Sequence, residues 1–362
     1  MTTTTKGALP AIWPRRFRVL SSGAGRISVR VDVRTLLVTL VLALATVLLS
    51  VWSLGVGSAD GTSLSLERVI GAFTGTESEV VRRIVVEGRL PRVLVAVLGG
   101  AALALSGAIF QTLTRNPLGS PDIIGFTSGA NTGALVAMLV LGSGYAGATV
   151  GSLVGGLLTG LVIYLLALKD GVHGTKLIVV GIGVSAMLVA FNGFLLVRAR
   201  VENAASAAAW GQGIFDQLRF VDVVAVAIVL LVLLPALAAL TPSLRMFELG
   251  EDAARSKGVD TGRVQLLLLV VGVGLVAAVT AVAGPIAFVA LIAPQVGKRI
   301  ARSAGIPLLT TAAVGASLLV LCDALARTML APVQLPVGVV TTALGGVYLL
   351  GLLLAQSRRV AS

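Results

Sequence analysis

Ten long apolar stretches recur along the sequence and limit what the chain can fold into. They lie at residues 35–55, 92–112, 124–142, 145–167, 175–197, 221–240, 264–283, 286–300, 307–326 and 337–355. A helix of about 20 apolar residues crosses the roughly 30 Å hydrocarbon core of a membrane, although the third and eighth stretches are short. Only helices and closed barrels satisfy their backbone hydrogen bonds in lipid, and no barrel-like alternation appears. The pattern predicts an all-α polytopic membrane protein with about ten transmembrane helices.

Charge supports the same class and predicts an orientation. Charged residues make up 12% of the chain, against about 25% in soluble domains, so much of the surface must face lipid. With both ends in the cytoplasm, 19 of the 28 Lys and Arg residues fall inside, which the positive-inside rule favours. We therefore expect a cytoplasmic N-terminus and C-terminus. Residues 1–34 form a basic cytoplasmic segment that contacts anionic headgroups rather than nucleic acid, and residues 35–357 form the transmembrane domain.

The sequence lacks the residues that catalysis or metal binding would need. No G-x-x-x-x-G-K-[ST] phosphate loop occurs, and the single histidine, His173, and single cysteine, Cys322, allow neither a catalytic triad nor a cysteine cluster. We expect no catalytic site, no metal site and no cofactor held by this chain. Polar residues within the spans are few: Asn131, Asn192 and Asp323. An ion-coupled secondary transporter would need titratable groups near the midplane, so an external energy source is favoured.

Two segments interrupt the apolar pattern in a way typical of broken helices. "LTRNPLGSP" (113–121) is expected to turn at the inner face, and the chain then re-enters as "DIIGFTSGANTGA". In "AGPIAFVALIAP" (283–294), Pro285 and Pro294 are expected to bracket a short helix. Irregular backbone at membrane depth survives where protein or water satisfies it, and such breaks line transport pathways.

Two charged segments outside the spans each allow two interpretations. Residues 56–91 are expected to be extracytoplasmic helices that end at "RLPR", with Arg89 and Arg92 at the outer mouth of the next span. These arginines either reach lipid phosphates or bind a partner. The cytoplasmic segment 247–258, "FELGEDAARSKG", is either a connector or a lever inserted into a partner. Gly258 can end a helix there.

Four motifs in a fixed order resemble one family. "RLPRVLVAVLGGAALALSGAIFQTLTRNPLGSPDIIGFTSGANTGA", "ELGEDAARSKGV", "AGPIAFVALIAPQ" and "QLPVGVVTTALGG" are together similar to the FecCD family of ATP-binding-cassette (ABC) permeases, which import iron chelates and vitamin B12. The likeness runs from about residue 36 to 355.

The resemblance implies the fold and partners of a type II ABC importer in a bacterial cytoplasmic membrane. Two ten-helix permeases enclose one path, two ATPase subunits bind ATP and Mg inside the cell, and a substrate-binding protein docks outside. The subgroup it resembles favours a ferric siderophore as substrate and a heterodimer with a second, related permease. A cobalamin or haem permease is the alternative within the class. A structural or assembly membrane protein would need neither the inside lever nor the outside arginines.

The resemblance also assigns roles to residues. Contact with the ATPase falls on a coupling segment: Glu248, Leu249, Gly250, Glu251, Ala253, Ala254 and Gly258. Within it, Glu251 is the expected polar contact, and Leu249 and Ala253 are expected on one helical face at i, i+4. Docking of the binding protein falls on Arg89, Arg92 and Arg327, and the inner gate on Asn116, Leu118, Gly174 and Thr175.

Three positions depart from the family pattern. The wider family usually has His where this chain has Gln295, Glu where it has Gln334, and an apolar residue where it has Lys257. We expect the first two to bear on substrate and subunit pairing, and the third on the fit to the ATPase.

Overall fold

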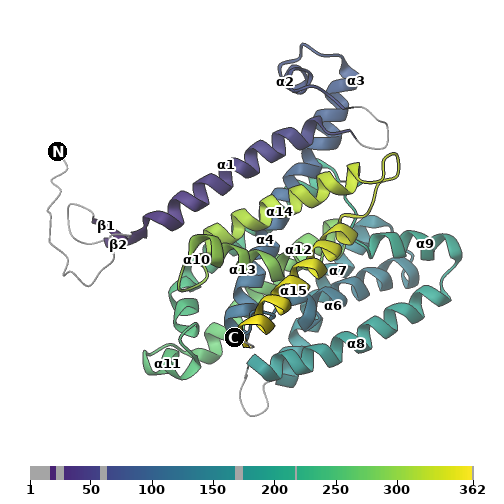
Figure 1. Ribbon diagram of the computed structural model, residues 1–362. Helices are drawn as coiled ribbons and strands as arrows, with labels where there is room; N and C mark the ends of the chain where they lie inside the picture. The colour runs from purple at the N-terminus through teal and green to yellow at the C-terminus, as the bar shows by residue number, and fades with distance from the viewer. Residues whose placement is uncertain (1–16, 22–27, 58–62, 168–173, 217, 361–362) are drawn as a thin grey trace.

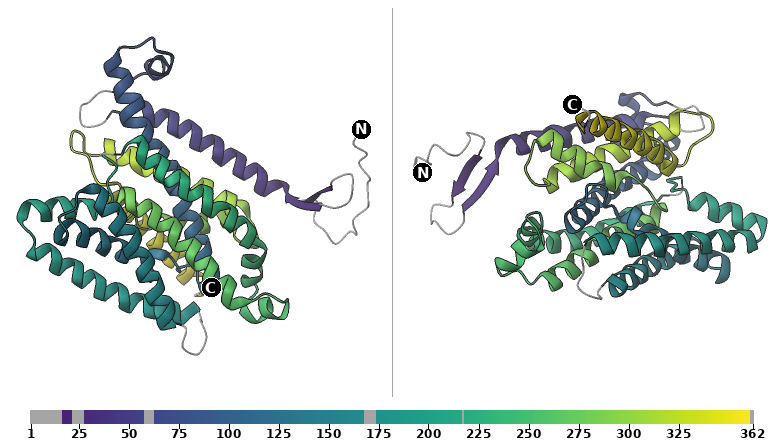
Figure 2. Two further views of the ribbon diagram at one scale, coloured as in Figure 1. Left: turned by 180° about the vertical axis from the view of Figure 1, so that it is seen from behind. Right: turned by 60° about the horizontal axis from the view of Figure 1, so that its bottom comes forward.

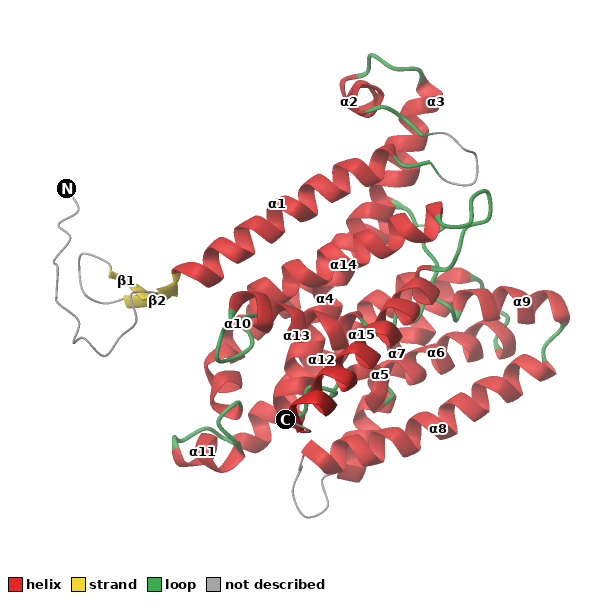
Figure 3. Ribbon diagram, in the orientation of Figure 1, coloured by secondary structure: helices red, strands yellow, loops and turns green. Residues whose placement is uncertain are grey.

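The computed structural model describes residues 17–21, 28–57, 63–167, 174–216 and 218–360, which are almost entirely helical (Figures 1 and 3). The elements in chain order are the strands β1 (Phe17–Ser21) and β2 (Ser28–Asp32), then α1 (Val33–Gly55), α2 (Leu66–Thr74), α3 (Glu79–Arg82), the π-helical η1 (Arg83–Arg89), α4 (Leu90–Thr114), α5 (Pro121–Ile124), α6 (Phe126–Leu135), the π-helical η2 (Val136–Val140), α7 (Tyr145–Ala167), α8 (Gly174–Arg198), α9 (Val201–Trp210), α10 (Phe220–Phe247), α11 (Glu251–Ser256), α12 (Thr261–Ala283), α13 (Val289–Ala301), α14 (Leu308–Thr328) and α15 (Val337–Val360).

Every predicted apolar stretch falls on a helix. Within the described residues, seven helices are long and apolar enough to cross a membrane: α1, the continuous helix Glu79–Thr114, α7, α8, α10, α12 and α14. Phe126–Val140 and Val337–Leu352 are shorter apolar helices. The helical membrane class is therefore confirmed, while the count of about ten spans stays a prediction.

A short hairpin before α1 is the part of the fold that the sequence did not predict. β1 and β2 pair antiparallel, with Phe17 opposite Asp32 and Ser21 opposite Ser28. The hairpin extends beyond the N-terminal end of α1, away from the bundle (Figures 1 and 2). Asp32 then caps α1, because its side chain accepts hydrogen bonds from the backbone N–H groups of Arg34 at 3.1 Å and Thr35 at 3.4 Å.

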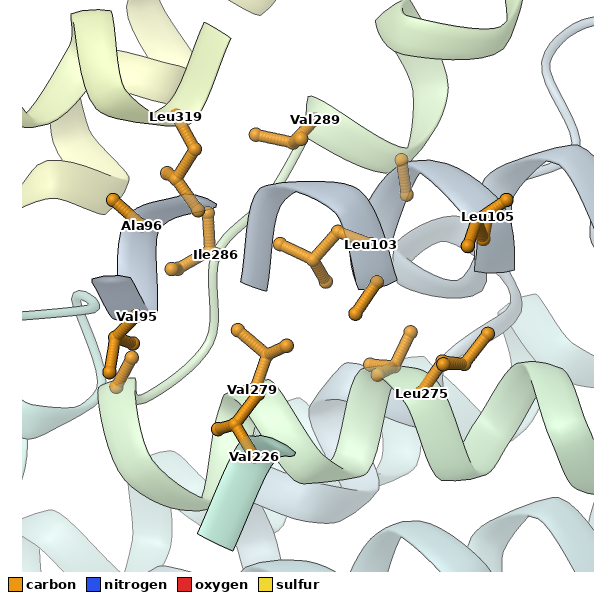
Figure 4. Close-up of a cluster of buried hydrophobic side chains, with 14 of the residues drawn as sticks. Val95, Ala96, Leu103, Leu105, Val226, Leu275, Val279, Ile286, Val289 and Leu319 are labelled. Atoms are coloured by element: carbon orange, nitrogen blue, oxygen red, sulfur yellow. The ribbon is translucent and has the colours of Figure 1, made fainter. Parts of the chain in front are cut away.

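The helices α4 and α12 form the centre of the bundle. In each, 78% of the most apolar 18-residue window is buried, compared with 6% in α1 and 17% in α8 and α10. Figure 4 shows the cluster in which Val95 and Leu103 of α4 meet Leu275 and Val279 of α12. The outer helices therefore leave apolar faces for lipid or for another subunit.

Small residues let α4 approach its neighbours closely, as membrane helices commonly do. A Cβ atom added to Gly100 would lie 2.3 Å from the carbonyl oxygen of Gly315 in α14, and one added to Gly107 would lie 1.7 Å from that of Ala290 in α13. Pro294 supplies no N–H to bond that Ala290 carbonyl within α13, so its oxygen remains free to face the α4 backbone.

The second break differs from the expected one. Pro294 does not end a helix but lies inside α13, which begins only at Val289 after the extended residues that follow Gly284.

The two ends of the bundle carry different elements. The start of α1, the connector α11 and the end of α15 lie toward one end, and α2, α3 and α9 lie toward the other (Figures 1 and 2). The two groups of predicted site residues are therefore separated by the length of the bundle.

Candidate translocation path and its two ends

A buried cluster of three arginines lies at the end of the bundle that carries α2 and α3. Arg89, Arg92 and Arg327 are only 5%, 7% and 1% exposed. Asp323 of α14 holds two of them: its Oδ1 is 2.6 Å from Nε of Arg92, and its Oδ2 is 3.2 Å from Nη2 of Arg327. Buried charges are stable only when paired in this way.

Arg92 has two further partners on other elements. Its Nη1 donates to Oδ1 of Asp216, in the segment between α9 and α10, and to Oε1 of Gln334, just before α15, both at 3.1 Å. Gln334, one of the departures from the family pattern, is thus a neutral ligand to Arg92 where a Glu would carry a charge.

The other two arginines close the end of α1. Nη1 of Arg89 donates to the carbonyl of Leu54 at 2.8 Å, and Arg327 donates to the carbonyl of Val56 and to both the carbonyl and the hydroxyl of Ser53. The last carbonyls of a helix have no partner within the helix, and basic side chains satisfy them favourably.

These contacts bear on the expectation that the arginines bind lipid phosphates or a partner. The three arginines do gather at one end of the fold, where they line a cavity of about 240 Å³ together with Asp216, Phe215 and Gln334. They face other parts of the same chain, however. Apart from the Asp323–Arg327 pair, whose members are four residues apart in α14, the partners lie more than 30 residues away in sequence and leave no local signal.

The turn within residues 113–121, called the inner turn after the side of the membrane predicted for it, has the expected irregular backbone. Arg115 ends α4 in the left-handed conformation, with φ 49°. Oδ1 of Asn116 accepts the Leu118 N–H at 2.9 Å, and the Leu118 side chain is 41% exposed. Ser120 then caps α5, whose first residue is Pro121. Two of the predicted gate residues therefore shape one exposed turn.

The other two predicted gate residues, Gly174 and Thr175, begin α8. The inner turn lies beside this helix, because α5, which follows the turn, packs against α8. Ile124 of α5 and Leu177 of α8 belong to the same buried cluster. His173 lies outside the described residues.

The coupling segment is organised differently from the predicted helix 247–258. Gly250, with φ 111°, separates the end of α10 from α11, so Leu249 precedes the short helix and is 71% exposed, and Leu249 and Ala253 do not form a helical i, i+4 pair. Ala254 is fully buried. Gly258 follows the helix with φ 81°, as a terminating glycine should.

Two of the three acids in this segment have different contacts. Glu251 forms an ion pair within α11, 3.0 Å from Arg255. Glu248 reaches another element, because its Oε1 accepts the backbone N–H of Ile306 at 2.8 Å in the turn between α13 and α14. The contact of Glu251 with the ATPase stays a prediction, whereas Glu248 links the segment to another part of the same chain.

Asp122 is a residue of interest that the sequence reasoning missed. Its Oδ1 accepts the Thr127 hydroxyl at 2.7 Å, and its Oδ2 accepts the backbone N–H of Phe288 at 3.1 Å. The acid directly follows Ser120 and Pro121, where an acidic residue in a first helical turn is common, so its long-range partner left no local signal. Gln295, in turn, donates to Oε1 of Gln111 at 2.6 Å, inside the bundle.

The long apolar helices define an integral membrane protein. Its two irregular breaks are of the kind that line transport pathways in such proteins. A model of the FecCD transport family matches residues 42–355. Since this match covers most of the sequence, the chain belongs to the FecCD transport family.

Individual proteins give the same result. The chain is 44% identical over 326 residues to the ferric enterobactin transport system permease protein FepG of Escherichia coli (strain K12). The aligned region covers 90% of this chain and 98% of FepG. It is 31% identical to the Fe(3+)-citrate import system permease protein YfmE of Bacillus subtilis (strain 168), covering 90% and 97% of the two chains. A solved metal-chelate type ABC transporter in an inward-facing conformation superposes with a TM-score of 0.76 at 28% identity, covering 88% of this chain and 98% of that one.

Proposed function

We propose that the chain is the permease subunit of an ABC importer that moves a ferric siderophore across the cytoplasmic membrane into the cell. One observation carries the proposal: the 44% identity to the ferric enterobactin permease extends over 98% of that protein, so the likeness is to a whole permease. A citrate-chelate permease is more distant, at 31%. A hemin permease of Yersinia pestis is equally distant, at 32%, so it is the likeness to the ferric enterobactin permease that favours a siderophore over cobalamin or haem.

The energy source in this proposal is a partner. The sequence contains no phosphate-binding loop, so two ATPase subunits would bind ATP and Mg on the cytoplasmic side. A binding protein would deliver the chelate on the outer side. With about ten spans, both termini would be cytoplasmic, which the excess of inside Lys and Arg supports.

Coupling to the ATPase would use the turn and helix from Glu248 to Gly258. Leu249 is 71% exposed and offers an apolar contact, whereas buried Ala254 supports the helix from within. Glu248 would pass the motion on, because its bond to Ile306 N–H links the segment to the α13–α14 turn. Replacing Leu249 by Asp should uncouple ATP hydrolysis from uptake, and unchanged uptake would contradict this role.

The inner gate would be formed by Asn116 and Leu118 together with Gly174 and Thr175. The exposure of Leu118 and the connection from the inner turn to α8 support this. Thiol labelling of Leu118→Cys in a Cys322→Ala background should change between nucleotide-free and ATP-bound complexes. Equal labelling in both states would count against a gate.

Docking of the binding protein at the arginine cluster would occur through the cavity rather than through an exposed rim. Nη2 of Arg92 is a buried atom with no hydrogen-bond partner in the described part of the chain, so a carboxylate of the partner would have to enter the cavity to bind there, and would displace no existing bond. Truncating one member of a desolvated interfacial charge pair costs about 2–5 kcal/mol. Arg92→Gln should therefore weaken binding of the purified partner to the complex in nanodiscs, whereas Arg263→Gln at an exposed position should not.

A second permease would pack against α8 and α15. Both helices carry large exposed apolar side chains, such as Phe194 and Val347, and glycines with no neighbour within 4 Å of an added Cβ, such as Gly193 and Gly351. Small residues favour helix contacts in membranes. We propose a heterodimer with a related permease. Isolation of an active complex that contains only this permease would refute it.

Uptake by cells tests the proposed function. A strain that carries the chain should accumulate one labelled ferric siderophore from a panel that also includes ferric citrate, haemin and cobalamin, and a deletion strain should not. Accumulation of haemin or cobalamin alone would select the alternative substrate.

A further inference from the structure

Asp122 joins the two breaks in the helical bundle. It lies in α5, directly after the inner turn, and its two carboxylate oxygens accept one donor from each broken segment: the Thr127 hydroxyl in α6 and the Phe288 N–H at the start of α13. Asp122 and Phe288 are 166 residues apart in sequence. Their contact therefore links two segments that the chain itself does not hold together.

Phe288 has an unusual backbone conformation for a bulky residue. Its φ of 68° and ψ of −25° lie in the left-handed region, where a large side chain is strained and where such strain often marks a functional position. The residues around it are anchored, since Ile286 and Val289 are buried and point into the main core cluster (Figure 4). Asp122 satisfies the N–H of the strained residue itself.

The Phe288 ring packs so closely against Gly345 of α15 that a larger residue there would clash with it. A Cβ atom added to Gly345 would lie 2.2–2.4 Å from the Cβ, Cγ and Cδ1 atoms of Phe288, whereas one added to the adjacent Gly346 would have nothing within 4 Å. Phe288 is thus held on its backbone by Asp122 and faces Gly345 with its ring.

Asp122 and Phe288 lie between α8 and α15, two of the helices that expose large apolar side chains. α5 packs against α8, and α13 packs against α15; Figure 3 shows α5 between α15 and α8. Two residues beyond Phe288, Ala290 packs against Gly107, well inside the length of α4. Phe288 and Asp122 are each partly exposed, so neither is sealed within the core of the bundle.

We propose that Asp122 is a positioning residue of the translocation path, which holds the Phe288 ring against Gly345 as an apolar constriction between α8 and α15. Because the same carboxylate follows the inner turn, displacement of that turn moves Phe288 as well. This inference rests on the transport function proposed above.

Two substitutions release the ring from opposite sides, and one matched control leaves it in place. Asp122→Ala removes both acceptors, and Gly345→Ala places a methyl group where the Phe288 ring lies. Gly346→Ala adds the same methyl group to open space. The complete complex, with its ATPase and binding protein, is reconstituted in proteoliposomes. Two quantities are measured: the number of ferric chelates taken up per ATP hydrolysed, and the rate at which a water-soluble thiol reagent labels Ala287→Cys in a Cys322→Ala background.

We expect both Asp122→Ala and Gly345→Ala to raise the labelling rate and to lower uptake per ATP. For Asp122→Ala, which loses two hydrogen bonds to a charged group, the labelling rate should rise at least about tenfold. Gly346→Ala should behave as the unmodified complex. The double variant should be no worse than the more severe single variant, because both changes act on one ring.

The proposal is overturned if Gly345→Ala labels like Gly346→Ala, or if Asp122→Ala leaves uptake per ATP unchanged. Gly345→Ala keeps the test decisive should Asp122→Ala fail to fold. If the unmodified complex takes up no chelate, the transport function fails, while the labelling rates still report whether Asp122 and Gly345 position the ring.

Discussion

Removing the Asp323 carboxylate should destabilise the chain more than any other single loss of charge at the end of the bundle that carries α2 and α3. Asp323 is fully buried and lies 2.6 Å from Nε of Arg92 and 3.2 Å from Nη2 of Arg327. Asp323→Ala leaves both guanidinium groups buried. The other acid beside the cluster, Asp216, is 50% exposed and contacts only Arg92, so Arg327 would lose its counter-charge completely.

The magnitude follows from the burial of the pair. Removing one partner of a buried ion pair costs about 3–5 kcal/mol, which is about two to four powers of ten in the folding equilibrium constant. Asp323→Asn retains an acceptor for Arg92 but no charge, so it should cost less, about 1.5–3 kcal/mol.

Equilibrium unfolding of the purified chain in mixed micelles, titrated with sodium dodecyl sulfate and followed by circular dichroism, measures these differences. Glu87→Ala is the matched control, because Glu87 pairs with Arg83 at 3.8 Å while their side chains are 69% and 71% exposed. Such a pair contributes about 0–1 kcal/mol. A loss for Asp323→Ala within about 1 kcal/mol of this control would refute the assignment of Asp323 as the charge that stabilises the cluster.

Two further changes separate coupling from packing. Glu248→Ala removes the acceptor of the Ile306 N–H and should lower chelate uptake per ATP in reconstituted complexes without loss of folded protein. Arg263→Ala, which breaks only the exposed pair with Asp260, should have little effect, and equal effects would contradict the link. Gly107→Ala would place a Cβ 1.7 Å from a carbonyl oxygen of α13 and should destabilise the chain by about 1–3 kcal/mol through overpacking, whereas Gly193→Ala in open space should be neutral in the same unfolding measurement.

The features that the sequence predicts are those encoded locally. The spans follow from runs of apolar residues, and the inner turn follows from Pro117, Gly119 and Pro121 within a few positions. The end of α11 follows from Gly258, which adopts the positive φ that a helix-terminating glycine favours. Each of these signals lies within one turn of the structure that it specifies.

The features that sequence reasoning misses depend on partners far away in the chain. Arg92 looks like a membrane-surface arginine until α14 brings Asp323 within 2.6 Å, 231 residues later. Asp122 looks like an ordinary acid in a first helical turn until α13 presents the Phe288 N–H. Local pattern cannot show which buried donor a carboxylate will meet, because that depends on how the helices pack.

The central claim, an ATP-driven permease for a ferric chelate, is tested most directly by transport in a defined system. The chain is reconstituted in proteoliposomes with its partner permease, its ATPase enclosed with ATP and Mg, and its binding protein outside with a labelled ferric siderophore. The account predicts uptake that requires ATP and stops when the ATPase is inactivated. Uptake that continues without ATP and follows an imposed proton or sodium gradient would contradict it.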